Sequence, residues 1–308
     1  MEFIIVILKS IFLIFVIILI VAYMVYLERK FLGWFQNRFG PNRAGPFGIF
    51  QSIADAVKLI FKEEVFPERR DKILYFLSPL IVVIFSFIPF SIIPIGKKPL
   101  IADIKISLLL IIVISSLSVY GVILAGISSG SKYPLIGSLR ACAQVLSYEI
   151  PLIISIIAIS LQAETFSLRE IIEKQKIPYI FPQFLGFLSF FWAALADSRR
   201  IPFDLPEAES EIVGGYNTEY SGIKFAWFFL GEYAHLLLIS SLIVILYLGG
   251  GNLFVFLIKL LILIFIFYWI RASLPRVRFD QLLNFSWKYL IPLSFTNLII
   301  VSIFKVIK

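Results

Sequence analysis

The stretch FIIVILKSIFLIFVIILIVAYMVYL (residues 3–27) contains a single charged residue, Lys9. About 20 apolar residues in a helix cross the roughly 30 Å hydrocarbon core of a bilayer, so this run is long enough to span a membrane. It is also too long for the apolar region of a signal peptide, and the chain begins Met-Glu rather than with basic residues. We therefore expect a transmembrane helix here and not a cleaved leader.

Similar runs continue along the chain, in which 60% of the 308 residues are hydrophobic and Phe occurs 32 times. A soluble globular domain is nearer half apolar. The expected spans are residues 3–27, 75–94, 104–127, 139–161, 177–196, 224–248, 254–270 and 289–306. The sequence thus predicts an all-α integral membrane protein, a single membrane domain over residues 1–308 with about eight transmembrane helices. Gly249-Gly250-Gly251-Asn252 predicts a tight turn between the sixth and seventh spans.

The net charge of +8 indicates membrane topology rather than nucleic-acid binding, because Lys and Arg collect in the cytoplasmic loops of membrane proteins. An even number of spans puts both termini on one side. Of the 28 Lys and Arg residues, 18 lie in the loops after the first, third, fifth and seventh spans. We therefore expect a multi-pass protein of a bacterial-type cytoplasmic membrane, with those loops cytoplasmic and both termini outside.

Few residues of the chain are suited to holding a cofactor. Cys142 is the only Cys and His235 the only His. Iron–sulfur clusters are typically held by four Cys thiolates, and zinc needs three or four ligands, so no metal site is expected. No glycine-rich nucleotide-binding loop occurs. If electrons move, we expect another subunit to carry them.

Two further helices are expected not to span. Residues 46–62 have the 3.6-residue period of an amphipathic helix. Its apolar face is Phe50, Ile53, Ala54, Val57 and Phe61, and its polar face is Gln51, Asp55, Lys58 and Lys62. Such a helix lies either in the membrane interface, apolar face down, or against a partner on the soluble side. The second helix is expected at residues 168–175, where Ser167 and Glu170 have the spacing of a capping box.

Two carboxylates lie inside apolar runs: Glu149 near the middle of the fourth and Glu232 about two turns into the sixth. A charged acid at the bilayer centre costs about 2.5–3.5 kcal/mol on insertion scales, so such acids face a polar cavity, pair, or stay protonated. Pro151 removes one backbone donor and frees a carbonyl near Ser147. This combination is typical of a proton path, and a neutral, hydrogen-bonded structural Glu is the alternative.

The loop between the fifth and sixth spans is rich in acids, namely Asp197, Asp204, Glu207, Glu209, Glu211 and Glu219. Glu207 and Glu211 are four apart, so on a helix they share a face and raise each other's pKa. The acids then form a group that changes its proton count when a nearby charge changes. A solvated acidic loop is the alternative, although interleaved Pro, Gly and aromatic residues indicate an ordered loop. We expect His235 to be satisfied by a neighbouring acid.

Four long stretches resemble one known family, in order over nearly the whole chain. They are LERKFLGWFQNRFGPNRAGPFGIFQSIADAVKLIFKEE (27–64), LRACAQVLSYEIPL (139–152), RIPFDLPEAESEIVGGYNTEYSG (200–222) and RASLPRVRFDQLLNFSWKYLIPLS (271–294). The family is that of the proton-pumping NADH:quinone oxidoreductase (respiratory complex I) subunit called H in bacteria and subunit 1 in mitochondria.

The resemblance implies an eight-helix subunit at the junction of the peripheral and membrane arms, with quinone as the substrate. It implies hydrophilic partner subunits around a quinone chamber, one of them bearing the terminal iron–sulfur cluster, and small and antiporter-like membrane partners. NADH, FMN and the clusters belong to partners, with no redox centre in this chain. The implied quinone-chamber residues are Arg29, Arg38, Asp55, Lys58 and Glu63. The implied proton path is Glu149, Glu207, Glu209, Glu211, Glu219 and Glu232.

One departure from the family pattern concerns the residues before the Pro-Phe-Asp motif. The family usually reads Ala-Glu-Thr-Asn-Arg there, whereas this chain reads Ala196-Asp197-Ser198-Arg199-Arg200. The acid is one methylene shorter, and a cation replaces Asn, so no role is assigned to Asp197. Two other functions are weighed: the membrane anchor of a related energy-converting hydrogenase or other quinone or phenazine reductase, and a free-standing ion-coupled transporter. The chain shows no half-to-half similarity of the kind common in transporters.

Overall fold

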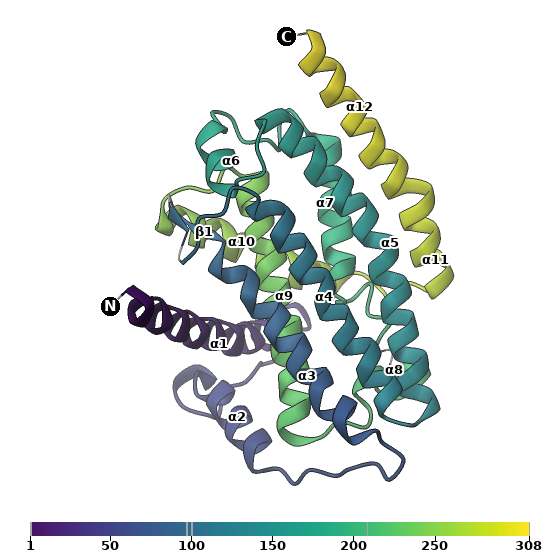
Figure 1. Ribbon diagram of the computed structural model, residues 1–308. Coiled ribbons are helices and arrows are strands. Elements are labelled where there is room, and N and C mark those ends of the chain that lie inside the picture. Colours follow the sequence, from purple (N-terminus) through teal and green to yellow (C-terminus); the bar gives the residue numbers. More distant parts are fainter. Residues whose placement is uncertain (1, 97, 100, 208, 308) are drawn as a thin grey trace.

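The computed structural model describes residues 2–96, 98–99, 101–207 and 209–307, and within them the chain is almost entirely helical (Figure 1). The sheet found there is a two-stranded antiparallel hairpin of β1 (Pro94–Ile95) and β2 (Lys98–Pro99). Seven helical segments of the described chain are long and apolar enough to cross a membrane. The prediction of an all-α, multi-pass membrane protein is therefore confirmed.

The seven segments follow the expected spans closely. They are α1 (Glu2–Phe35), α3 (Lys72–Phe87) continued by η2 (Ile88–Ser91), α4 (Ser107–Ser128), α5 (Lys132–Ala163), α9 (Gly222–Leu246), α10 (Leu253–Ser273), and α11 (Phe279–Phe285) continued through a π-helical turn, η4 (Ser286–Leu290), into α12 (Ile291–Ile307). Gly249, Gly250 and Gly251 all have positive φ in the turn between α9 and α10, which confirms the predicted tight turn.

The fifth expected span, residues 177–196, is only partly helical. Helix α7 (Phe184–Asp197) has 14 residues, which at 1.5 Å per residue is about 21 Å and short of a roughly 30 Å core. Pro178 and Pro182 lie in the turns that precede it, where the residue before each Pro is restricted to extended backbone. The Ile180 amide instead donates to the Tyr247 carbonyl at the end of α9, 3.0 Å away. The expectation of a full-length fifth helix was therefore wrong at its first turns.

Helix α9 occupies the centre of the bundle and contacts α1, α2, α3, α6 (Leu168–Lys174) and α10 (Figure 1). All its residues from 236 to 246 are buried. On its other side α5 packs against α4, α7 and α12. Glu149 on α5 and Glu232 on α9 are therefore carried by the two helices with the most buried residues.

The proline in α5 has a specific consequence. Pro151 cannot donate to the carbonyl of Ser147, and the Ser286 hydroxyl, in the π-helical turn η4, donates to that carbonyl at 2.6 Å. The carbonyl is indeed freed, as predicted, but Ser286 occupies it. It is thus a contact between α5 and η4 rather than an open position beside Glu149.

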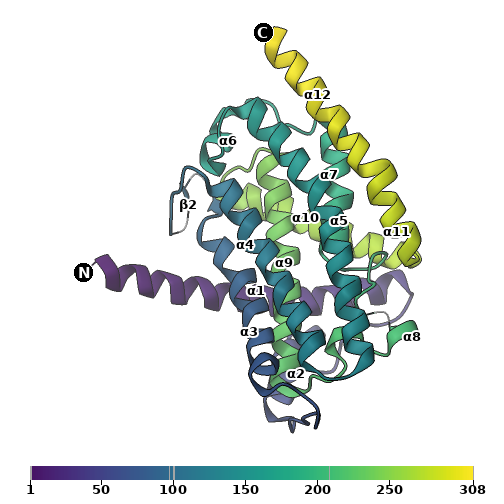
Figure 2. The same ribbon diagram turned by 45° about the vertical axis from the view of Figure 1, so that its right-hand side comes forward.

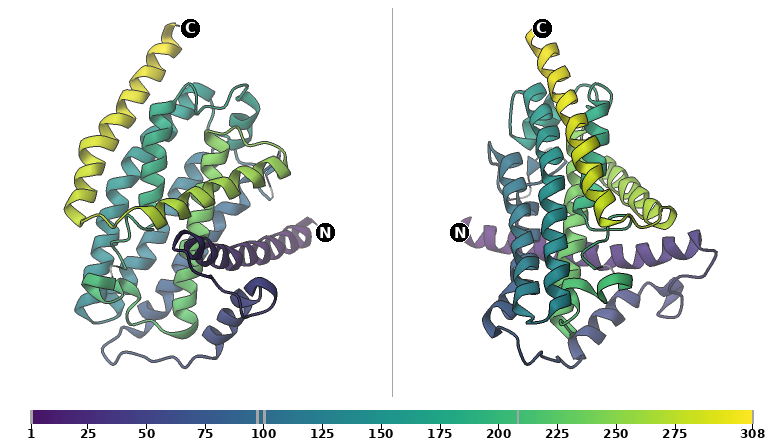
Figure 3. Two further views of the ribbon diagram at one scale, coloured as in Figure 1. Left: turned by 180° about the vertical axis from the view of Figure 1, so that it is seen from behind. Right: turned by 90° about the vertical axis from the view of Figure 1, so that its right-hand side faces the viewer.

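Helix α1 lies across the bundle rather than along it (Figure 2 and Figure 3). Its contact with the core is made by Ile17, Val21, Met24 and Glu28, which are spaced three or four residues apart and buried. Most of the apolar side chains from Ile4 to Leu19 are exposed. The second half of α1 therefore makes most of the contact with the rest of the chain, and Leu13 adds to it from the first half.

The amphipathic segment begins with η1 (Pro46–Gly48) and continues as α2 (Gln51–Phe61). Its polar side faces α1: the Ser52 hydroxyl donates to the Ala22 carbonyl at 2.8 Å, and Asp55 pairs with Arg29. Its apolar side chains point outward, Ile53 being 55% and Phe61 82% exposed. The predicted amphipathic helix is thus present, and its apolar face is left for lipid or a partner to cover.

Helix α6 starts where expected, but not with the expected cap. Ser167 is the N-cap residue, yet its side chain makes no capping hydrogen bond. The Leu168 amide donates instead to the hydroxyl of Ser107 on α4, at 2.9 Å. A tertiary contact has replaced the predicted capping box because the helix start is buried against α4.

Candidate functional site

The loop between α7 and α9 folds back onto the membrane helices and brings a buried arginine to Glu232. Arg200 Nη2 lies 3.8 Å from Glu232 Oε2, and its guanidinium stacks 4.0 Å from the ring centre of Tyr233. The Tyr216 hydroxyl, in η3 (Gly215–Asn217), donates to Glu232 Oε1. Separating such a buried ion pair is costly, because it leaves a charge without its partner. These contacts therefore hold the loop against α9.

Two loop acids complete this first cluster. The negative charge of Glu232, followed by burial and by Asp204, raises the pKa of Glu207 well above its usual value. Burial and then the charge of Glu232 raise the pKa of Asp204 to about 6. Like charges this close cannot all ionise without cost. The cluster can therefore gain or lose a proton in response to a nearby charge.

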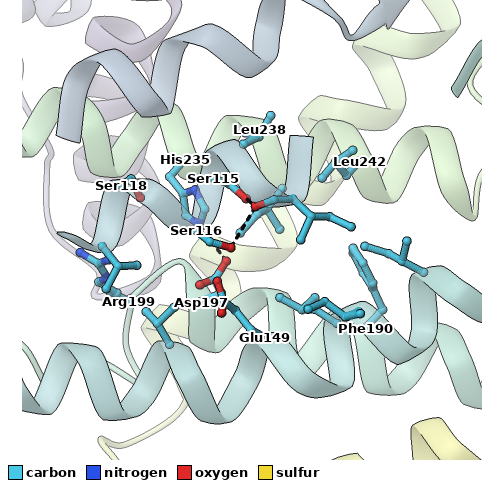
Figure 4. Close-up of a pocket in the computed structure, with 17 residues that line it drawn as sticks. Ser115, Ser116, Ser118, Glu149, Phe190, Asp197, Arg199, His235, Leu238 and Leu242 are labelled. Atoms are coloured by element: carbon cyan, nitrogen blue, oxygen red, sulfur yellow. Dashed lines mark hydrogen bonds and ion pairs between the residues drawn. The ribbon is translucent and has the colours of Figure 1, made fainter. Parts of the chain in front are cut away.

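The second cluster surrounds a cavity of about 40 Å³ (Figure 4). Glu149 from α5, Asp197 from the end of α7 and His235 from α9 converge on it. His235 Nε2 lies 2.8 Å from Asp197 Oδ2. Ser115, Ser116 and Ser118 of α4 line the same cavity. A water needs at least about 10–15 Å³, so the space admits water among groups that can hydrogen-bond to it.

A smaller cavity of about 10 Å³ joins the two clusters. Asp197, His235 and Arg199 line both this cavity and the larger one, while Glu232 lines only the smaller. Ionisable side chains are therefore arranged in sequence from Glu207 through Glu232 and the Asp197–His235 pair to Glu149.

The predicted proton-path residues are only partly brought together. Glu149, Glu207 and Glu232 belong to the clusters. Glu211 lies on the surface, where its hydrogen bond to Arg140 lowers its pKa. Glu219 is half-buried, and its backbone carbonyl accepts from the Tyr75 hydroxyl at 2.7 Å. The Glu209 side chain lies outside the part of the chain that the structure describes.

The predicted pairing of Glu207 with Glu211 was wrong. Glu207 lies in a turn, whereas Glu211 belongs to helix α8 (Glu209–Ile212), so the two acids do not share a helix face. Asn217 Nδ2 donates to Glu207 at 3.1 Å. The predicted rise in the pKa of Glu207 occurs, but its source is Glu232, across a loop-to-helix contact that spacing alone does not reveal.

Sequence reasoning named Asp204 among the loop acids but not among the site residues, and it missed Arg200 and Tyr216 as members of the first cluster. All three lie within the stretch 200–222 that carries the family resemblance, and Arg200 and Asp204 flank its Ile-Pro-Phe segment. The signal was thus present in the sequence. The expectation that an acid satisfies His235 is confirmed, and that acid is Asp197 rather than Glu232.

The predicted quinone-side residues lie around α1 and α2. Arg29 Nη1 is 2.6 Å from Asp55 Oδ2, which joins the two helices. Arg38, Lys58 and Glu63 are exposed. Between α2 and α9 lies a cavity of about 430 Å³, a size suited to a small molecule. It is lined by Leu59 and Lys62 of this segment and by loop and α9 residues that include Glu207, Asn217, Phe225 and Phe229.

Comparison with known proteins gives the family. A sequence profile described as NADH dehydrogenase matches residues 8–302. The chain belongs to the NADH dehydrogenase family. The matched residues run from α1 to α12 and include every acid of both clusters.

Members of this family from several bacteria are similar over most of their length. The H subunit of the NADH-quinone oxidoreductase of Rickettsia typhi is 46% identical, over 92% of this chain and 89% of the relative. The H subunit from Dehalococcoides mccartyi is 44% identical, over 93% and 83%. An H subunit from Koribacter versatilis is 42% identical, over 97% and 96%. Among the described residues of this family member, no three His, Cys, Asp or Glu side chains gather where they could hold a metal ion.

Proposed function

We propose that this chain is a membrane subunit of a proton-pumping NADH:quinone oxidoreductase, placed at the junction with the peripheral arm. It forms part of the quinone chamber and relays quinone reduction to proton translocation through buried acids. Relatives named as the H subunit of NADH-quinone oxidoreductase support the proposal. Their names favour it over a hydrogenase or phenazine-reductase anchor and over a free-standing transporter.

The main support for the proposal is that Glu207 belongs both to the large cavity and to the first acid cluster. It lines the cavity of about 430 Å³ beside α2, and the charge of Glu232 is the main cause of its raised pKa. A charge that changes in the cavity is therefore felt by the acid cluster at the start of the path. The cavity opens between α2 and the α7–α9 loop, where hydrophilic partner subunits would complete its walls.

The proposed reaction takes up two electrons and two protons for each quinone reduced to quinol. Electrons come from the partner that bears the terminal iron–sulfur cluster, since no residue of this chain carries them. The negative charge that develops in the chamber draws protons toward Glu207 and Asp204. Transfer then follows Glu232 and Glu149 into the membrane, toward the antiporter-like partners.

The remaining predicted residues have places in this proposal. Arg29 and Asp55 fix α2 against α1, and Arg38, Lys58 and Glu63 are exposed where partner subunits would bind. The loop between α7 and α9 supplies protons from the cytoplasmic side through its other acids, Glu209, Glu211 and Glu219. Because Glu211 is paired with Arg140 at the surface, its contribution is smaller than that of Glu149.

The experiment is Glu149→Gln in the native complex, with quinone reduction and membrane potential measured in vesicles and normalised to assembled complex. Gln keeps the size and hydrogen bonding of Glu but does not titrate. Turnover and pumping should fall together, since a stalled proton step blocks the redox step. Glu173→Gln, at an exposed position of α6 paired with Arg169, is the matched control and should match wild type. Wild-type turnover and pumping in Glu149→Gln would return this acid to a structural role.

A further inference from the structure

We propose that the Asp197–His235 pair transfers protons between the two acid clusters, with His235 as the relay. The inference rests on the proposed function and adds to it a link that contains the only imidazole of the chain. His235 Nε2 lies 2.8 Å from Asp197 Oδ2, and Figure 4 shows both side chains directed toward Glu149. The pair lines both the cavity that contains Glu149 and the cavity that contains Glu232.

The cavities show why this pair, and not another, makes the connection. Only three ionisable residues of the described chain line both of them: Asp197, His235 and Arg199. Arg199 stays protonated at any pH the protein meets, so it supplies positive charge but cannot pass a proton on. His235 and Asp197 can each exist with and without the proton.

The second ring nitrogen of His235 is available for the transfer. Nδ1 is enclosed and has no hydrogen-bond partner among the described residues. His235 follows Glu232 by three residues on α9, so both side chains lie on nearly the same face of that helix. A water in the small cavity would be within reach of both, because a space of about 10 Å³ is close to the minimum for one molecule.

The proposed transfer has two steps. Neutral His235 accepts a proton at Nδ1 from the side of Glu232, and the proton on Nε2 passes to the carboxylate of Asp197. Neutral Asp197 then gives that proton, through water in the cavity of about 40 Å³, to the carboxylate of Glu149. The imidazole ends neutral, in its other tautomer, and reorientation of the ring restores the starting state.

The polar side chains around His235 come from four helices and the end of α7 and are of two kinds, charged groups and hydroxyls. The charged groups that face it are Asp197 and Arg199 at the end of α7, Glu149 on α5 and Glu232 on its own helix. Helices α3 and α4 contribute hydroxyl groups instead, those of Ser86 and of Ser115, Ser116 and Ser118. Three acids and one arginine therefore lie around the imidazole.

The test uses His235→Gln, Asp197→Asn and the double variant in the native complex. Gln can still donate to Asp197, so it keeps the tie between α7 and α9 and removes only the titration. We expect turnover and pumping to fall together by about tenfold. This loss is smaller than that expected when a positioned acid–base group is lost completely, because water can partly take over its role. The double variant should be no worse than Asp197→Asn alone. The pH profile of turnover should lose one step in His235→Gln.

Several outcomes of this test would overturn the relay. Wild-type turnover and an unchanged pH profile in His235→Gln would overturn the relay, and so would additive losses in the double variant. If His235→Gln does not assemble, an assembled Asp197→Asn variant with wild-type pumping would overturn it instead. Glu149→Gln is measured in parallel: a loss there with an intact His235→Gln rejects only this link, whereas wild-type behaviour in both rejects the proposed function itself.

Discussion

Glu28 on α1 is ion-paired with Arg271 on α10, and the Glu28 side chain is only 4% exposed. The Tyr268 hydroxyl donates to the Met24 carbonyl at 3.0 Å one turn away. These polar contacts connect the first membrane helix to the seventh expected span. They were not anticipated, because nothing in the spacing of Glu28 and Arg271 relates residues so far apart in the chain.

Arg271→Leu should weaken the attachment of α1 by about 3–5 kcal/mol, because it leaves Glu28 buried without its partner. The double variant Glu28→Leu/Arg271→Leu should recover much of that loss, since no buried charge remains. The measurement is the thermal stability of the purified complex in detergent for both single variants and the double. Additive losses would contradict a direct pairing.

The raised pKa of Asp204 predicts a pH dependence of stability. A carboxyl whose pKa rises from 3.8 to about 6 on folding stabilises the folded state fully below its unfolded pKa. That stabilisation is lost as the pH rises from about 4 to about 6. Thermal unfolding of wild type should therefore become easier over this interval, and Asp204→Asn should flatten the dependence. An identical slope in both proteins would exclude Asp204 as its source.

Leu59 lines the large cavity beside α2, whereas Ile60, the next residue, points outward and is 59% exposed. Leu59→Trp should raise the KM for quinone, because the indole fills space in the cavity. Ile60→Trp adds the same group to the outer face and should leave KM unchanged. Electron input to the iron–sulfur clusters is measured as well, to confirm that the peripheral arm is intact. Equal KM values in the two variants would argue against entry beside α2.

The charge asymmetry between the loops predicts the orientation of the chain in the membrane. A reporter fused at Ser131, between α4 and α5, should report the cytoplasmic side. A reporter at Gly250, between α9 and α10, should report the opposite side. Accessibility labelling of single cysteines at the same positions provides an independent check. The reverse pattern would overturn the proposed sidedness.

The membrane helices could be predicted because their signal is local. A run of apolar residues identifies a span wherever it packs, and the observed helices differ from the expected ones mainly at their ends. The fifth span was overestimated because Ile177, Tyr179 and Ile180 are apolar, yet two prolines keep them out of the helix. Apolar composition predicts which segments span the membrane, whereas backbone hydrogen bonding determines where each helix begins and ends.

The site was harder to predict because its parts meet through tertiary contacts. The acids Glu149, Glu207 and Glu232 were found from chain pattern and resemblance. The connections among them, through Tyr216, Asp204 and the Asp197–His235 pair, depend on a loop folding back onto α9. The departure from the family pattern at Asp197 was visible in the sequence, but its hydrogen bond to His235 was not.

The crosswise position of α1 has a mechanical consequence. With 34 residues, α1 is about 51 Å long, well above the roughly 30 Å thickness of a hydrocarbon core. An overlong helix fits a bilayer by tilting, and the tilt follows the local thickness. Because most side chains of its outer half are exposed while Glu28 is fixed to Arg271, α1 can change its inclination about its inner end. The first half of α1 can thus follow the local bilayer thickness, while its second half stays packed against α9, which carries Glu232 and His235.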